Sequence, residues 1–190
     1  ALMDLFAGWE ESDYGNLAMV RGVYESGFTH YDMNHMPGYY ALAAIGLFFT
    51  DDTVWAAKIC SWLGGMLAYV AALFWTRHWL GWKPALIVGL LLIGQAEFSL
   101  YSASALREPI YAAALMGVLW GMGSNNVLLL IGSAALAFSV RFEAPLALLP
   151  LGIYLFRRPK HGLGLFVGLS ISILSWSMYC MEVHGTYRFW

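Results

Sequence analysis

The stretch that decides the fold is Val54–Thr76, which reads VWAAKICSWLGGMLAYVAALFWT and carries a single charge, on Lys58. A helix rises about 1.5 Å per residue, and about 20 apolar residues cross the roughly 30 Å hydrocarbon core of a bilayer. This stretch therefore predicts a membrane-spanning helix. Other apolar runs follow it, so we expect an all-α, polytopic helical membrane protein with about five to six spanning or partly spanning helices. These runs are Pro84–Ala105, Pro109–Val140, Ala144–Phe156 and Gly162–Met181.

The composition of the whole chain agrees with this prediction. The 190 residues are 60% hydrophobic and 12% charged, with a mean hydropathy of +0.62. Soluble domains average about 45–50% apolar and about 25% charged residues. A soluble enzyme and a disordered chain are therefore excluded. The formal net charge of −2 offers no basic field for a nucleic acid.

The distribution of charge predicts the orientation. The loops 77–83 and 157–161 hold five of the ten Lys and Arg residues and none of the twelve acids. By the positive-inside rule these loops face the cytoplasm, which places the chain in the plasma (inner) membrane. The run Pro109–Val140 is either one crossing or a hairpin of two short spans. The sequence GSNN at Gly123–Asn126 favours the hairpin, although each half is short for a bilayer.

Three parts follow from this layout. Residues 1–52 form an outer-face loop region, residues 53–181 the transmembrane bundle, and residues 182–190 an outer-face tail. In the first part, Ser12 is suited to cap a helix that begins at Asp13, and Leu17, Val20 and Tyr24 share one face of it. This predicts an amphipathic helix on the membrane surface. The next apolar run, Tyr39–Phe49, is too short to span and predicts an interfacial helix.

Charged residues within or beside the spans are functional candidates, each with a structural alternative. Lys58 and Glu97 could instead form a buried pair that orients two helices. Arg107 with Glu108, and Arg141 near Glu143, are either ligand-binding groups or interfacial anchors. A metal site is a weak prediction for the loop sequence HxDxxH, formed by His30, Asp32 and His35. Taken together, several cations and a loop acid on one side of the membrane suit a lipid phosphate and a hydroxyl-bearing partner.

Five segments, in order, resemble the GT-C superfamily of polyprenyl-phosphate-sugar glycosyltransferases, of the protein mannosyltransferase and aminoarabinose transferase type. SDYGNLAMVRGVYESGF and NHMPGYYALAAIGLFF resemble the first outer loop of that family. VWAAKICSWLGGMLAYVAALFWTRHWLGWKPALIVGLLL resembles the following pair of spans. SASALREPIYAAALMGVLWG and AALAFSVRFEAPLALLPLGIYLF resemble the next outer loop and the helix pair around a basic residue.

The resemblance implies a reaction and a set of site residues. It implies inverting transfer of a sugar from a polyprenyl-phosphate donor to an acceptor hydroxyl on the outer face, with Asp13 as the base. It implies a divalent cation in some members of the family, held with the help of Glu108. The donor phosphate would be bound by Lys58, Arg107, Arg141 and His35. Partners would be the lipid-linked sugar and membrane lipids, with further membrane subunits or a missing C-terminal part.

The chain also departs from the family pattern. Its members have a span before the first loop and several hundred further residues, and mannosyltransferases carry a second acid where Tyr14 follows Asp13. The chain is therefore expected to be the N-terminal membrane part of such an enzyme, a half-enzyme that needs a partner, or a relative without activity. The main alternative is a non-catalytic structural subunit of a larger membrane assembly, because a fold alone does not grant a function. A small transporter is less favoured, since the sequence shows no internal repeat.

Overall fold

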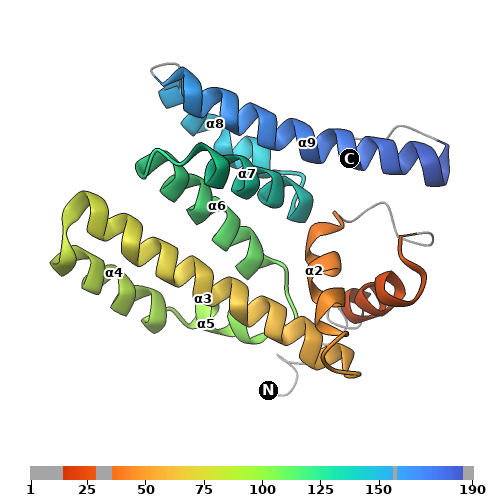
Figure 1. The fold of residues 1–190 in the computed structure, drawn as a ribbon. Coiled ribbons are helices and arrows are strands. Elements are labelled where there is room, and N and C mark those ends of the chain that lie inside the picture. Colours follow the sequence, from red (N-terminus) through yellow and green to blue (C-terminus); the bar gives the residue numbers. More distant parts are fainter. Residues whose placement is uncertain (1–14, 29–35, 156–157, 186–190) are drawn as a thin grey trace.

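A computed structural model describes residues 15–28, 36–155 and 158–185 of the chain (Figure 1). All regular structure in these ranges is α-helical, which confirms the predicted fold class. A first helix covers residues 15–26. The others are α2 (Gly38–Gly46), α3 (Thr53–Leu80), α4 (Trp82–Gly94), α5 (Ala96–Ala103), α6 (Glu108–Gly123), α7 (Val127–Val140), α8 (Ala144–Leu155) and α9 (Pro159–His184).

Two helices, α3 and α9, are each long and apolar enough to cross a membrane, which indicates a membrane protein. The helices α4 and α5 pass the same test together, but they are bent by 66° at the break between them. The span predicted over Pro84–Ala105 is thus two helices joined at a bend, and they form either a broken span or a re-entrant loop. The break lies at Gln95, whose backbone is extended (φ −81°, ψ 107°) and so cannot continue the helix. The predicted total of five to six spans stays a prediction.

Successive long helices run in alternating directions, and this gives the bundle two ends (Figure 1). The end that holds the N-terminus of α3, the start of α6 and the C-termini of α7 and α9 is named the acidic end here. It carries Asp51, Asp52, Glu108, Glu143 and Glu182. The other end, with the α3–α4, α6–α7 and α8–α9 connections, is named the basic end. It carries Arg77, Lys83, Arg158 and Lys160.

The predicted hairpin in the run Pro109–Val140 is confirmed. Helix α6 ends at Gly123, and α7 begins at Val127 and packs back against α6. Between them Asn125 takes a left-handed conformation (φ 60°), which Asn tolerates better than most residues. The side chain of Asn126 then caps α7 by accepting a hydrogen bond from the backbone N–H of Leu129 at 3.1 Å.

Small residues hold the bundle together. The buried residues of α3 are all Ala, Gly, Ser, Cys or Thr, while its large apolar side chains face outward, as expected in lipid. A Cβ atom on Gly64 would lie 2.6 Å from Ile110 Cδ1 and 2.7 Å from the Ile110 backbone nitrogen. A Cβ on Gly168 of α9 would meet the carbonyl oxygen of Ile131 in the same way. These glycines let α3 approach α6, and α9 approach α7, at backbone distance.

The basic connection at 77–83 is shorter than predicted. Helix α3 continues to Leu80 and α4 starts at Trp82, so Gly81 alone joins them. Gly81 has φ 87°, a conformation that glycine adopts at no steric cost. Arg77 thus lies in the last turn of α3, where a cation is favoured by the helix dipole.

A helix is confirmed at residues 15–26 in the predicted outer-loop region, and its place on the membrane surface stays a prediction. Val20 on its inner face is fully buried, and Leu17 packs against the same core. Tyr24 is 43% exposed but meets Phe48 edge-on, at 5.5 Å between ring centroids. Helix α2 ends at Gly46, three residues earlier than predicted, and α9 runs past the predicted span at both ends, as far as His184. Ser12, the predicted cap, lies outside the described residues.

Candidate functional site

Two residues predicted to act at the outer face meet at the acidic end. Arg141 Nη2 lies 3.4 Å from Glu108 Oε1, and both side chains are about one-third exposed (32% and 34%). The α6–α7 hairpin explains the contact, because it returns the end of α7 to the start of α6. Each charge also suits its helix end, since a carboxylate is favoured in the first turn and a cation at the last.

This ion pair leaves hydrogen-bonding capacity unused. Glu108 Oε2 and Arg141 Nε are both buried from solvent and have no hydrogen-bond partner. The Arg141 guanidinium also lies 5.7 Å from the ring centroid of Tyr111, within the range of a cation–π contact. A buried polar atom without a partner is costly, so the pair is suited to a ligand that supplies one acceptor and one donor.

Arg107 directly precedes α6, beside α3. Ser61 Oγ donates a hydrogen bond to the carbonyl oxygen of Leu106 at 2.6 Å. The hydroxyl of Tyr39 lies 3.2 Å from the same Ser61 oxygen, so α2, α3 and the start of α6 meet at one point. Ser61 is one turn along α3 from Lys58. The backbone of Arg107 is therefore fixed near the level of Lys58 on α3.

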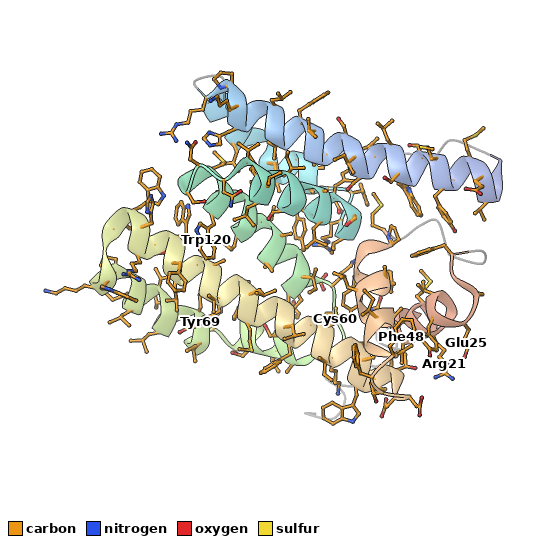
Figure 2. All side chains as sticks on the ribbon, viewed as in Figure 1. Arg21, Glu25, Phe48, Cys60, Tyr69 and Trp120 are labelled. Atoms are coloured by element: carbon orange, nitrogen blue, oxygen red, sulfur yellow. The ribbon has the colours of Figure 1, made fainter. Side chains whose placement is uncertain are left out.

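Lys58 lies at the head of a groove between α3 and α5. A hollow of about 480 Å³ is lined by Trp55, Lys58, Ile59, Trp62 and Ala103. A second hollow of about 370 Å³ shares Trp62 and Ala103 and continues along α3 to Tyr69, which Figure 2 places farther along the bundle, toward the basic end. The result is an apolar groove with a cation near its acidic end.

The alternative that pairs Lys58 with Glu97 is wrong. Both residues are exposed, and the structure records no ion pair between them. The break at Gln95 is the physical reason, because it turns α5 and starts a new helix in whose first turn Glu97 lies. Lys58 is thus open to a ligand in the groove.

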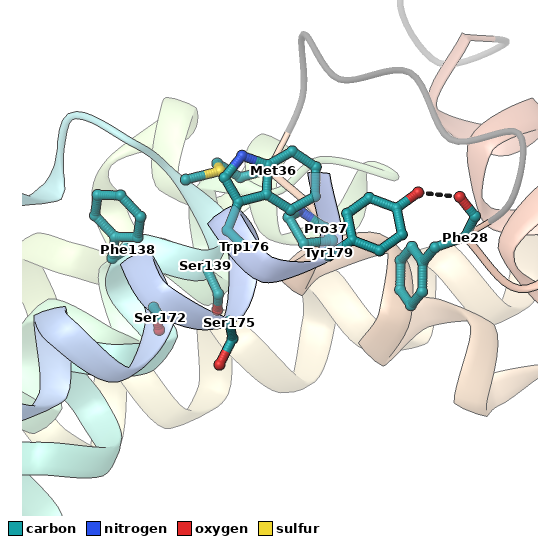
Figure 3. Close-up of a pocket in the computed structure, with 9 residues that line it drawn as sticks. All are labelled: Phe28, Met36, Pro37, Phe138, Ser139, Ser172, Ser175, Trp176 and Tyr179. Carbon is teal, nitrogen blue, oxygen red and sulfur yellow. Dashed lines mark hydrogen bonds between the residues drawn. The ribbon is translucent and has the colours of Figure 1, made fainter. Parts of the chain in front are cut away.

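A third feature of the acidic end is a cavity of about 220 Å³ where α7, α9 and the start of α2 come together (Figure 3). Four of its nine lining residues are aromatic, and two of these, Trp176 and Tyr179, stack at 5.2 Å between centroids. The Tyr179 hydroxyl donates to the carbonyl oxygen of Phe28 and so joins α9 to the outer-loop segment (Figure 3). Three serines supply polar groups. They are Ser139, Ser172 and Ser175.

The structure therefore places four of the predicted residues at the acidic end, but it does not join them into one site. Glu108 contacts Arg141, while Lys58 occupies a separate groove and Arg107 has no recorded ion pair with a described residue. Asp13 and His35, like His30 and Asp32, lie outside the described residues. Within residues 15–28, 36–155 and 158–185, no three His, Cys, Asp or Glu side chains come together as metal ligands would.

Sequence reasoning missed several residues of this end. Ser61 and Tyr111 were not singled out, although Ser61 follows Lys58 at the i+3 spacing of one helix face. Ser172 and Ser175 share the same spacing, which could have indicated a polar stripe on α9. Tyr111 carries no comparable signal, because its role depends on a contact with Arg141 across the hairpin.

Comparison with protein-family models, with characterised proteins and with solved structures finds no match to this chain. The resemblance to the GT-C superfamily thus remains a prediction from the sequence.

Proposed function

We propose that the chain is a membrane glycosyltransferase of the GT-C type, or the N-terminal membrane module of one, that uses a polyprenyl-phosphate-linked sugar. The observation that carries the proposal is the apolar groove between α3 and α5, which has Lys58 near its acidic end. A lipid phosphate needs a cation near the membrane surface and an apolar path for its chain, and the groove combines both. Arg107 directly precedes α6 near this groove, and the next residue, Glu108, forms an ion pair with Arg141 at the end of α7.

The proposed topology extends beyond the helices that pass the length test. We take α6, α7 and α8 to cross wholly or in part, which with α3, the bent α4–α5 pair and α9 gives about six crossings. Each of these shorter helices packs against a longer one, α6 against α3, and α7 and α8 against α9. The connection at 77–83 and the loop 157–161 then face the cytoplasm, and the acidic end faces outward from the plasma membrane.

In the proposed reaction, Asp13 takes the proton of an acceptor hydroxyl, whose oxygen attacks the anomeric carbon of the donor. The bond between that carbon and the phosphate oxygen breaks on the opposite side, and polyprenyl phosphate leaves with the electron pair. Positive charges stabilise the leaving phosphate. This role is assigned to Lys58, Arg107, Arg141 and His35. Glu108 orients Arg141 through the ion pair, and in a form that binds a divalent cation it would contribute an oxygen ligand.

The test of the base uses two acids of the same outer region. Asp13→Asn is expected to lower sugar transfer at least about 100-fold, since removing a general base costs about that factor or more. Asp51→Asn is the matched control, because Asp51 is exposed and helix α3 is capped by Asp52 instead. Both variants should extract and migrate as the wild type does. Unchanged turnover in Asp13→Asn would remove the assignment of the base.

The test of the donor site needs no knowledge of the sugar. Polyprenyl phosphate itself is titrated onto the full chain in detergent micelles, with the uncharged polyprenol as the comparison ligand. Lys58→Gln is expected to weaken phosphate binding about tenfold and leave the polyprenol unaffected. Lys83→Gln, at the basic end, is the control and should bind normally. Equal binding of polyprenyl phosphate and polyprenol by the wild type would contradict the proposed donor.

A further inference from the structure

A second concave site lies at the basic end, away from the groove of Lys58. It is a hollow of about 300 Å³ between the last turns of α3 and the end of α6. Figure 2 shows Trp120, one of its walls, on α6 facing the last turns of α3. The polar and charged lining consists of Arg77, His78 and Ser124. The site takes no part in the proposed sugar transfer.

Aromatic rings form the rest of the wall. Phe74 and Trp120 stack with 5.7 Å between centroids and an interplanar angle of 13°. Gly123 leaves room beside them, because a Cβ atom there would lie 3.3 Å from Trp79 Nε1. Indole rings are enriched where a membrane protein passes the headgroup region, since they combine an apolar body with one N–H donor. The hollow is thus built from groups that favour the headgroup level.

The charge of the hollow is positive and not neutralised by neighbouring acids. The sequence holds no Asp or Glu between Asp52 and Glu97, or between Glu108 and Glu143, which covers both helices that frame the site. The Arg77 guanidinium lies 4.0 Å from the centroid of the Trp82 ring, a cation–π contact that leaves its positive charge in place.

Two carbonyl oxygens at the end of α6 are satisfied within the protein. Such carbonyls are the negative end of a helix dipole. The Trp120 carbonyl oxygen accepts hydrogen bonds from both the backbone N–H and the hydroxyl of Ser124, at 2.8 and 2.7 Å, and the Gly121 carbonyl oxygen accepts one from the Asn126 N–H at 2.9 Å. These two carbonyls are therefore occupied, and the charged side chain in the lining is that of Arg77.

We propose that this hollow binds the headgroup of one anionic glycerophospholipid from the leaflet at the basic end. Arg77 supplies the positive charge for the phosphodiester, His78 offers a ring N–H as a hydrogen-bond donor, and the stacked rings of Phe74 and Trp120 pack against the start of the acyl chains. A lipid bound there contacts both α3 and α6, at the end opposite the proposed active site. The ligand is recognised by its negative charge and by the fit of its headgroup in the hollow.

The experiment distinguishes lipid binding in the hollow from attraction of lipids by the overall positive charge of the basic end. Native mass spectrometry of the full chain in detergent micelles counts bound phosphatidylglycerol against phosphatidylcholine. We expect one phosphatidylglycerol to bind in preference. The double variant Arg77→Gln/His78→Gln should weaken it about tenfold or more. The matched control Arg158→Gln/Lys160→Gln also changes two basic residues at the same end and should stay within about twofold of the wild type.

A third variant tests the fit without changing the charge. Gly123→Leu fills the hollow and is expected to reduce binding as strongly as the Arg77/His78 variant, with the same melting temperature as the wild type. Equal loss in the two charge variants would show a diffuse basic belt and overturn the site. Unaltered binding in Gly123→Leu would also overturn it. Full competition by glycerol 3-phosphate would show a free phosphate site instead of a lipid site.

Discussion

The two ends of the bundle are built from the same helices but carry opposite kinds of polar groups. At the acidic end, carboxylates and cations occur together, and Glu108 lies in contact with Arg141. Helices α3, α6 and α7 continue to the basic end, where the described charged residues are all cationic and several tryptophans surround them. Mixed charges can move protons and hold a phosphate, whereas cations alone attract anions and orient the chain in the membrane.

The difference teaches that charge is sorted along the helix axes and not between separate domains. Each long helix contributes to both ends, so the scaffold between them must hold its shape for either end to function. That scaffold is made of small residues on α3, α6, α7 and α9.

The largest expected effect is all-or-none labelling from the two sides of the membrane. Cys60 and Cys180 are buried, so a membrane-impermeant maleimide should react with them little. A cysteine introduced at Asp51 (acidic end) should be labelled on intact spheroplasts. A cysteine introduced at Ser124 (basic end) should be labelled only after permeabilisation. Labelling of both from the same side would break the comparison, because the two ends would then share one compartment.

The next largest effect concerns the scaffold. Gly64→Leu is expected to destabilise the protein by about 3 kcal/mol, because the new side chain must displace Ile110 and its backbone. Gly132→Leu is the matched control. Gly132 is exposed on α7 and has no atom within 4 Å of the Cβ position, so its unfolding free energy should stay near the wild-type value. Unfolding by a denaturing detergent in micelles, followed by tryptophan fluorescence, gives the comparison.

An unchanged unfolding free energy in Gly64→Leu would show that the close approach of α3 to α6 is not what holds the ends in register. An equal decrease of the unfolding free energy in Gly64→Leu and Gly132→Leu would have the same meaning. In either case the two ends could move independently, and the Glu108–Arg141 contact would need another cause.

Much of this scaffold could be predicted from the sequence. Length and hydropathy predicted the helix within Thr53–Leu80 correctly, because a long run of apolar residues has few other solutions in lipid. The hairpin at Gly123–Asn126 was favoured correctly, since Asn and Gly are suited to turns. The bend at Gln95 was not predicted. Nothing in the local sequence separates it from a continuous span, and the bend depends on how α5 packs against α3.

The candidate site was less accessible to sequence reasoning for the same reason. That these charges gather at one end of the bundle could be predicted from their order, but their partners depend on helix rotation and on contacts across the bundle. Lys58 and Glu97 were reasonable partners by depth, yet the bend at Gln95 separates them. Glu108 and Arg141 become partners only once the hairpin brings α7 back beside α6. Spacing along one chain does not specify such contacts.

The smallest expected effect is a difference in coupling energy between two ion pairs that lie toward the acidic end. A double-mutant cycle on Glu108→Gln and Arg141→Gln should give a coupling energy of about 1 kcal/mol. The pair is two-thirds buried, and either single variant leaves a charged group without its partner. Arg21 and Glu25 are the comparison, an exposed pair one helical turn apart. Glu25 raises the pKa of Arg21, chiefly through their hydrogen bond, so Arg21 stays charged at any physiological pH.

Despite that shift, the Arg21–Glu25 cycle should show no measurable coupling, because water and salt screen an exposed pair. The two cycles share one protein, one detergent and one unfolding assay, so their difference isolates the effect of burial. High salt should leave the Glu108–Arg141 coupling in place, since the pair is shielded by Tyr111 and the hairpin. Coupling that vanishes in salt for both pairs would mean that the acidic end is an ordinary solvated surface. The polar atoms of Glu108 and Arg141 would then give no preference for a ligand.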